Sequence, residues 1–206
     1  MEAGGSRCVL ESIDLDVASG EFVAIEGPSG SGKSTLLNVI AAIEPVDRGQ
    51  VQVADVELSS IGEPASTHFR RSHIGIVFQF FNLIPTLTVR ENLLLPLHLL
   101  KQRDGNRVDE LLSKLELPDR ADSFPDVLSG GEQQRVGVAR AMIHRPSVIL
   151  ADEPTGNLDE KTGEGVMALI TDAAREGTTV LMVTHAESAA ARADRRLLLR
   201  GGRLSG

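Results

Sequence analysis

The stretch Gly27-Pro28-Ser29-Gly30-Ser31-Gly32-Lys33-Ser34 decides the fold of this chain, because it matches in full a glycine-rich loop that surrounds phosphate groups. In such a loop, backbone N–H groups curl around the phosphates, Lys33 brings a positive charge to the β- and γ-phosphates, and the Ser34 hydroxyl binds Mg²⁺. Thr35 follows in the same turn. A chance match is on the order of one in a hundred for a chain of this size, so a plain glycine turn is the weaker interpretation.

The segments around the loop predict its place in the fold. An apolar run at 22–25 predicts a buried strand before the loop, and apolar residues at helical spacing predict a helix over 33–43 after it. Further strands are expected at 13–17, 50–56, 74–78, 147–152, 179–184 and 197–199, with a helix over 165–174. This alternation predicts an α/β fold with a mainly parallel sheet, whose ligands bind at the carboxyl ends of the strands.

The pattern changes from about residue 80 to 145, where leucines at helical spacing dominate. Four prolines are expected to break this region into short helices: Pro85, Pro96, Pro118 and Pro125. We therefore expect a single domain over 1–206, with a nucleotide-binding core over about 1–79 and 146–206 and an inserted helical subdomain over about 80–145.

Size, charge and cysteine content narrow the function. The chain has 206 residues and a net charge of −8, which argues against a nucleic-acid partner. Its one cysteine, Cys8, excludes an internal disulfide and is expected to be a small residue near an early strand. No secretory signal is expected at the N-terminus, and the best apolar run, 93–100, is shorter than the roughly 20 residues of a spanning helix. We therefore expect a soluble chain that reaches a membrane only through a partner.

Two acidic residues end the strand expected at 147–152. Asp152 would hold Mg²⁺, mainly through water, and Glu153 would orient or deprotonate an attacking water molecule. The alternative is an exposed acidic turn before Pro154, which a phosphate loop in the same chain makes the weaker interpretation.

The stretch Ser129-Gly130-Gly131-Glu132 is typical of a helix start. Ser129 fits an N-cap, and Glu132 fits the third position of a capping box. The two glycines also leave bare N–H groups at that helix end, which makes an anion site. Because the site lies on the helical subdomain, we expect a γ-phosphate bound to a second copy of the chain to fill it.

Three further polar residues are candidates, each with a structural alternative. Gln79 can contact Mg²⁺ or its water, or it can be a polar strand end. His185, after the strand at 179–184, can hydrogen-bond a γ-phosphate and steady the water, although a lone histidine is more often structural. Asp159 can cap a helix as well as cross a dimer interface.

Taken in order, these motifs resemble the ATP-binding cassette (ABC) ATPases over nearly the whole chain. The stretch Leu128-Ser-Gly-Gly-Glu-Gln-Gln-Arg135 is highly specific to that family. The resemblance implies a P-loop NTPase (RecA-like) core with a small antiparallel β portion, ATP and Mg²⁺ as ligands, and ATP hydrolysis coupled to transport. It also implies two cassettes packed head to tail, with ATP between residues 27–34 of one and 129–131 of the other.

A narrower likeness covers the stretch from Phe78 to Pro96, which is similar to the lipoprotein-releasing, macrolide-exporting and antimicrobial-peptide-exporting branch. This likeness implies a separate cytoplasmic subunit that sits on the inner face of the cell membrane and drives an integral membrane permease. Residues 80–96 would form the groove that receives a coupling helix of the permease. The alternative for Phe80 and Phe81 is core packing.

Two other classes of function stay open at this stage. Non-transport cassettes of DNA repair, chromosome structure or translation usually carry coiled coils, zinc modules or a second cassette, and this chain has none. The other open class is a degenerate cassette that binds nucleotide without hydrolysing it. The intact Lys33, Ser34, Asp152, Glu153 and His185 argue against it, although a short N-terminus leaves it open.

The chain departs from the family at its ends. Relatives usually carry an aromatic residue that stacks on adenine, ahead of the strand before the phosphate loop. Here no aromatic residue precedes Phe22, which belongs to that buried strand. The first strand of the family is also not found, and the tail after residue 200 is shorter than is usual.

We predict weak selectivity for adenine. Loss of base stacking costs about 1–3 kcal/mol, which is a factor of roughly 5 to 150 in affinity. Calorimetric titration with ATP and GTP should therefore give similar dissociation constants. A much tighter ATP complex would show that another group holds the base.

Overall fold

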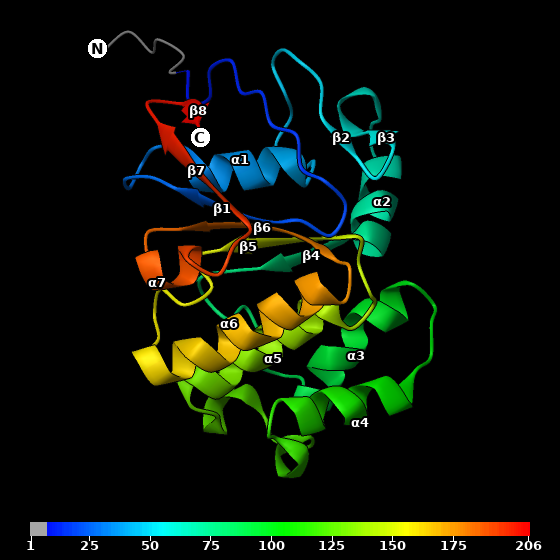
Figure 1. The fold of residues 1–206 in the computed structure, drawn as a ribbon. Coiled ribbons are helices and arrows are strands. Elements are labelled where there is room, and N and C mark those ends of the chain that lie inside the picture. Colours follow the sequence, from blue (N-terminus) through cyan, green and yellow to red (C-terminus); the bar gives the residue numbers. More distant parts are fainter. Residues whose placement is uncertain (1–7) are drawn as a thin grey trace, which may run out of the picture.

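The computed structural model describes residues 8–206, and a six-stranded sheet forms the centre of the fold (Figure 1). In spatial order its strands are β4 (Ile74–Val77), β5 (Val148–Asp152), β6 (Thr179–Thr184), β1 (Phe22–Glu26), β7 (Arg195–Arg200) and β8 (Arg203–Ser205). The first five run parallel, and β8 pairs antiparallel with β7. A separate antiparallel pair consists of β2 (Gln52–Val53) and β3 (Val56–Glu57). The expected α/β fold with a mainly parallel sheet and a small antiparallel portion is confirmed.

Helices cover both faces of the sheet (Figure 1). Helix α1 (Lys33–Ile40) lies on one face, and α5 (Gly130–Met142) and α6 (Glu160–Arg175) lie on the other. The remaining helices are α2 (Ala65–His73), α3 (Val89–Leu99), α4 (Gly105–Lys114) and α7 (Glu187–Ala190), with short 3-10 turns η1 (Leu58–Ser60), η2 (Pro118–Arg120) and η3 (Pro125–Val127).

Strand β1 shows why a continuous apolar run precedes the phosphate loop. Successive side chains of a strand point to opposite faces of the sheet. Phe22 and Ala24 therefore join the core beneath α6, whereas Val23 and Ile25 join the core beneath α1. Because both faces are covered, the four buried positions of the strand, 22–25, must be apolar. The loop at 27–34 thus follows a strand that is fixed on both sides.

A third group of buried residues lies outside the sheet. Side chains of α3, α4 and α5 pack together there, with Leu93 and Val136 fully buried among them. Every residue of this group falls between Val89 and Ile143. A separate apolar centre of this kind supports the predicted helical subdomain over about 80–145, whose limits stay a prediction.

Three expectations about local structure were wrong. Residues 13–17 form no regular strand, although Ile13, Leu15 and Val17 pack half-buried against the core beneath α1. The alternation of apolar and polar residues indicates that one side of this segment is buried. Burial of one side does not require hydrogen bonds to a neighbouring strand. Helix α6 begins at Glu160 and not near 165, because Asp159 caps it.

Pro96 does not break its helix but lies inside α3. A proline in a helix interior removes one hydrogen bond and strains the preceding turn. Leu93 and Leu97 on either side are almost fully buried in the helical subdomain, and this packing holds the turn in place. The helix then ends three residues later, at Leu99.

The ends of the chain bear on two earlier expectations. The segment in which no secretory signal is expected, 1–5, lies outside the described residues. Cys8 is exposed, and its thiol donates to the Leu10 carbonyl at 3.2 Å. Within residues 8–206, none of the helices combines the length and the apolar character needed to cross a membrane.

We predict that Gly75→Ala destabilises the protein by about 1–3 kcal/mol, because the added methyl group overpacks the core. A Cβ atom on Gly75 would lie 2.2 Å from the Ala141 carbonyl oxygen and 3.1 Å from Cγ of Pro146. Urea unfolding followed by circular dichroism measures the change. As the control, Gly105→Ala meets no atom within 4 Å and should be neutral or slightly stabilising. Equal stability of the two variants would contradict the packing of β4 against α5.

Candidate nucleotide-binding site

The glycine-rich loop joins β1 to α1 and leaves the start of that helix open. Gly32 takes the N-cap position with φ 101°, a conformation that favours glycine, and no side chain caps the helix. Gly27 permits a close approach, because a Cβ there would lie 2.3 Å from the Leu199 carbonyl oxygen. The first N–H groups of α1 therefore have no side-chain acceptor, which makes this helix end suited to an anion.

Lys33 supplies the positive charge of the loop. It is 9% exposed, and its Nζ donates to the carbonyl oxygens of Gly27 at 2.8 Å and Pro28 at 3.3 Å. No carboxylate pairs with it among residues 8–206. The buried Oγ of Ser31 also lacks a hydrogen-bond partner within that range. An unneutralised ammonium, an orphaned hydroxyl and an uncapped helix start together fit a phosphate group.

The parallel register brings the other candidates to the same edge of the sheet. Glu26, the last residue of β1, pairs with Thr184, the last residue of β6. Asp152, the last residue of β5, pairs with Val183. The residues that follow these strands therefore emerge side by side at the carboxyl edge, next to the phosphate loop.

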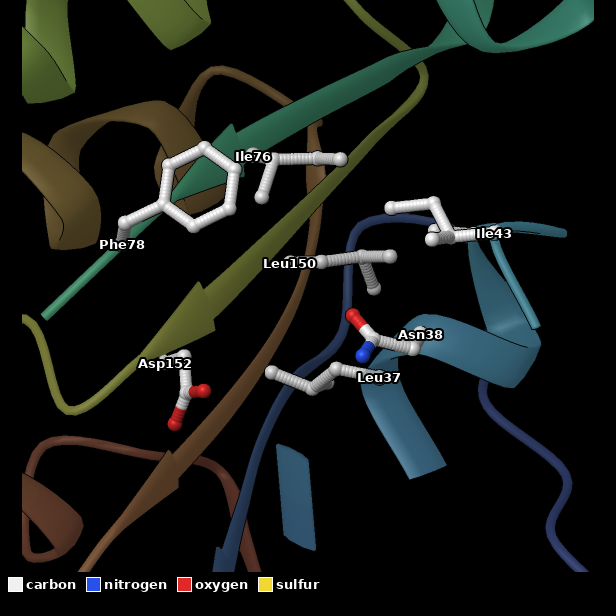
Figure 2. Close-up of a pocket in the computed structure, with 8 residues that line it drawn as sticks. Leu37, Asn38, Ile43, Ile76, Phe78, Leu150 and Asp152 are labelled. Carbon is white, nitrogen blue, oxygen red and sulfur yellow. The ribbon is translucent and has the colours of Figure 1, made fainter. Parts of the chain in front are cut away.

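Asp152 lies at one end of a hollow between α1 and the neighbouring strands (Figure 2). Leu37 and Asn38 line it from α1, and Ile76 and Phe78 line it from the side of β4. The Asp152 carboxylate is therefore close to the helix that begins at the phosphate loop. This carboxylate is an oxygen donor of the kind that Mg²⁺ prefers, as are the predicted partners, the Ser34 hydroxyl and the Gln79 amide.

Glu153 and His185, which were predicted as separate candidates, form a direct pair. The Nδ1 atom of His185 lies 2.7 Å from Oε1 of Glu153. The other carboxylate oxygen, Oε2, accepts from the Thr184 hydroxyl and from the His185 backbone N–H, both at 3.2 Å. Glu153 is 8% exposed and has φ 45°, which is uncommon for a residue with a side chain. Its carboxylate is thus held in one orientation by the end of β6.

Gln79 lies after β4, close to the loop that follows Glu153. A Cβ on Gly156 would be 3.4 Å from Nε2 of Gln79 and 3.4 Å from Cβ of Glu153. The Asn157 side chain also donates to the Gln79 carbonyl at 3.1 Å. The structure therefore brings Gln79 close to the loop that follows Glu153.

The helix start at Ser129 forms the expected capping box. The Ser129 hydroxyl accepts from the Glu132 N–H at 3.3 Å, and Oε2 of Glu132 accepts from the Ser129 N–H at 2.8 Å. The bonds that the Ser129 N–H and the Ser129 hydroxyl donate to this carboxylate lower the pKa of Glu132 below its usual value. Gly131 has a second role that the sequence did not indicate, because a Cβ there would lie 2.0 Å from Cγ2 of Thr162. It is the close-contact point between α5 and α6.

Asp159 caps α6, as one of its two interpretations states. Its Oδ1 accepts from the Thr162 N–H at 3.1 Å and its Oδ2 from the Thr162 hydroxyl at 2.6 Å. These bonds lower the pKa of the Asp159 carboxyl. A role across a dimer interface stays a prediction.

The sequence left two interpretations for Phe80 and Phe81, a groove for a partner helix and core packing, and the two residues differ in exposure. Phe80 is 67% exposed, whereas Phe81 packs against α5, where its Cζ would lie 3.3 Å from a Cβ on Gly130. Sequence reasoning missed two residues that contact the site, Thr184 and Gln134. The signal for Thr184 was its place next to His185 at the end of a strand.

A parallel sheet with a phosphate loop after β1, an acidic pair at the end of β5 and the capped helix α5 defines a P-loop nucleotide-binding cassette. The family model "ABC transporter" matches residues 10–156. The chain belongs to this family, as its ATP-binding and ATP-hydrolysing cassette.

Relatives and solved structures agree on this family. An uncharacterized ABC transporter ATP-binding protein of Mycobacterium tuberculosis, Rv0986, is 52% identical over 202 residues, which are 96% of this chain and 82% of that protein. The macrolide export ATP-binding/permease protein MacB of Shigella flexneri is 43% identical over 95% of this chain, which spans 31% of it.

The solved cassette MJ0796, a protein of Methanocaldococcus jannaschii, has a closely similar fold. Its dimeric post-hydrolysis state, bound to ADP and Pi, has a TM-score of 0.89 at 40% identity and covers 100% of this chain and 93% of that one. A second dimeric structure of it has a TM-score of 0.88 at 42% identity and covers 96% and 89%.

Proposed function

We propose that two copies of this cassette bind ATP between them, head to tail, and that hydrolysis drives a separate membrane permease from the cytoplasmic face. The observation that carries the proposal is the Glu153–His185 pair, at the sheet edge that also holds the phosphate loop and Asp152. The branch likeness of residues 78–96 favours export or extrusion of a lipoprotein or peptide.

A second copy is needed because the two anion sites belong to different parts of the chain. Lys33 lies at the sheet edge, whereas Ser129 begins α5 in the helical subdomain. The start of α1 has no side-chain cap, and the capping box of α5 does not use the N–H groups of Gly130 and Gly131, so both helix starts can donate to a phosphate. The solved relatives are described as dimers, which supports the same arrangement here. In it, residues 129–131 of one copy face residues 27–34 of the other, and Asp159 lies at the contact.

Each residue at the edge has a distinct proposed role. Residues 27–35 bind the phosphates, and Lys33 balances their charge. Ser34, Gln79 and Asp152 would hold Mg²⁺, which when bound neutralises charge on the transferring phosphoryl group. Glu153 orients the attacking water and accepts its proton, and His185 hydrogen-bonds the γ-phosphate and the water.

The Glu153–His185 contact supports this division of roles. The Glu153 carboxylate is held by the Thr184 hydroxyl, the His185 N–H and the His185 ring. It therefore already has a fixed orientation when the water molecule binds. His185 is 65% exposed on its side chain, so the same ring can contact a bound phosphate.

We predict that Glu153→Gln nearly abolishes ATP turnover, by about 100-fold or more, because the amide cannot accept the proton. ATP binding should persist, so an ATP-bound dimer should accumulate. Phosphate release measures turnover, and size-exclusion chromatography with ATP and Mg²⁺ detects the dimer. Glu187→Gln, at an exposed position of α7, is the matched control and should turn over normally.

Two results would contradict this account. Normal turnover by Glu153→Gln would remove Glu153 from the proposed role. A complex with Mg²⁺ and a non-hydrolysable nucleotide that is fully enclosed by one copy, with residues 129–131 of its neighbour far away, would remove the shared site.

A groove between the core and the helical subdomain supports a permease as the partner. Its lining comes from the region of α2 and β4 on one side and from α3 and α5 on the other: Arg71, Ile74, Gly75, Ile76, Phe78, Leu95, Pro96, Leu99, Arg140, Ala141 and His144. Only Leu95 and Pro96 come from the expected segment 80–96, so the lining extends beyond it on both sides. Leu99, at 50% exposed, and Phe78, at 38%, offer an apolar surface to a helix of the partner.

We predict that Leu99→Asp prevents a membrane permease from binding, because a carboxylate in the groove must be desolvated on docking. Purification from detergent-solubilised membranes should recover a permease with wild-type protein and not with this variant. The recovered protein should also change the ATPase rate. Phe124→Asp, an exposed apolar position outside the groove, is the control. Recovery of ribosomes or DNA in place of a membrane protein would favour a non-transport cassette.

A further inference from the structure

We propose that Gln134 is a positioning residue for ATP hydrolysis, because its side-chain amide joins helix α5 to both loops of the catalytic edge. Its Nε2 donates to the Phe78 carbonyl at 3.1 Å and to the Pro154 carbonyl at 2.8 Å. Phe78 directly precedes Gln79, and Pro154 directly follows Glu153. The inference therefore rests on the functions proposed for Gln79 and Glu153.

The chemistry of the contacts fixes how the amide is turned. Both partners are backbone carbonyl oxygens, which can only accept a hydrogen bond. The NH₂ group of Gln134 must face them, and each of its two N–H bonds is then committed to one loop. The side chain thus holds the ends of two adjacent strands, β4 and β5, from a single point on α5.

Burial supports a positional role for this amide. Gln134 is 1% exposed, and its Oε1 has no hydrogen-bond partner among residues 8–206. A buried amide oxygen without a partner lowers stability, whereas an apolar side chain of similar size would fill the space without this cost. The two donated bonds to the catalytic loops give a reason for glutamine here.

Other contacts hold the chain after β4 in the same manner. Asn157 donates to the Gln79 carbonyl at 3.1 Å, and Arg140 of α5 donates to the Asn82 carbonyl at 2.7 Å. Helix α5 therefore contacts the Gln79 segment on both sides, through Gln134 and Arg140. Gln134 also reaches the chain beside Glu153, so it can pass a movement of α5 to both catalytic residues.

The direction of this coupling follows from where α5 begins. Its N-terminal residues, 129–131, are the proposed contact with the ATP held by the second copy. When α5 shifts to meet that ATP, the amide of Gln134 moves the two carbonyls together. Gln79 and Glu153 then reach their working positions only when the second copy is in place, although Gln134 itself contacts no nucleotide.

The test replaces Gln134 by methionine, which keeps the volume and removes both donors. ATP affinity should change by less than about twofold, since the phosphate loop is untouched, and KM should stay the same. We expect kcat to fall by about 10- to 100-fold, because a small displacement of catalytic groups costs this much. Asn92→Leu is the matched control: it removes a buried amide that donates to the carbonyls of Ile84, Leu87 and Thr88 in the helical subdomain. This control should lower the thermal midpoint and leave kcat unchanged.

A double-mutant cycle separates positioning from general stability. If Gln134 acts through Gln79, the substitution Gln134→Met should reduce kcat much less in a Gln79→Ala background than in the wild type. A residue that only stabilises the fold would reduce kcat by the same factor in both backgrounds.

Each outcome decides the proposal. Wild-type kcat in Gln134→Met, or an equal loss of kcat in Asn92→Leu, overturns it. If Gln134→Met fails to fold, Gln134→Asn retains the amide but moves it away from both carbonyls, and wild-type kcat in that variant, or failure of both variants to fold, overturns it as well. An inactive Glu153→Gln beside an active Gln134→Met would reject this inference alone, whereas an active Glu153→Gln would reject the proposed function.

Discussion

The parallel register of β1, β5 and β6 is the constraint on which the site depends. Because Glu26 pairs with Thr184 and Asp152 with Val183, the three strands end within one residue of one another. Hydrogen bonds between strands thereby set the positions of groups that are far apart in the sequence. The apolar residues of β1 alternate between the two cores and fix this register, since a slip by one residue would exchange the faces that contact α1 and α6.

Two helix starts face opposite requirements in this structure. At α1, the cap is a glycine and the first N–H groups remain available for phosphate. At α5, Ser129 and Glu132 satisfy two backbone groups with a capping box, and the glycines between them allow close packing. The first helix start is therefore an open anion site, and the second combines a stabilising cap with a surface offered to a partner.

Sequence reasoning predicted the phosphate loop, the sheet and the acidic strand end, because these depend on local patterns and on the apolar period of each segment. It failed where a segment is buried without the hydrogen bonds that its apolar pattern suggests, or where packing overrides a local preference. Residues 13–17 alternate as a strand does but pack without a ladder, and Pro96 is carried inside a helix by its neighbours' packing. The Glu153–His185 contact and the buried amide of Gln134 join residues distant in the chain, so no local pattern could reveal them.

The site keeps its positive charge because its donors bind backbone carbonyls and not carboxylates. Lys33 donates to Gly27 and Pro28, whose carbonyl oxygens satisfy the ammonium without neutralising it. On the neighbouring strand β7, Arg195 and Arg196 form ion pairs with Glu21 and Glu26, and their charge is cancelled locally. The protein has a net charge of −8, which by itself repels anions. Because the charge of Lys33 is not neutralised, binding of an anion at the phosphate loop is electrostatically favourable. The ammonium of Lys33 therefore adds its charge to the open start of α1, and both favour a triphosphate at this edge of the sheet.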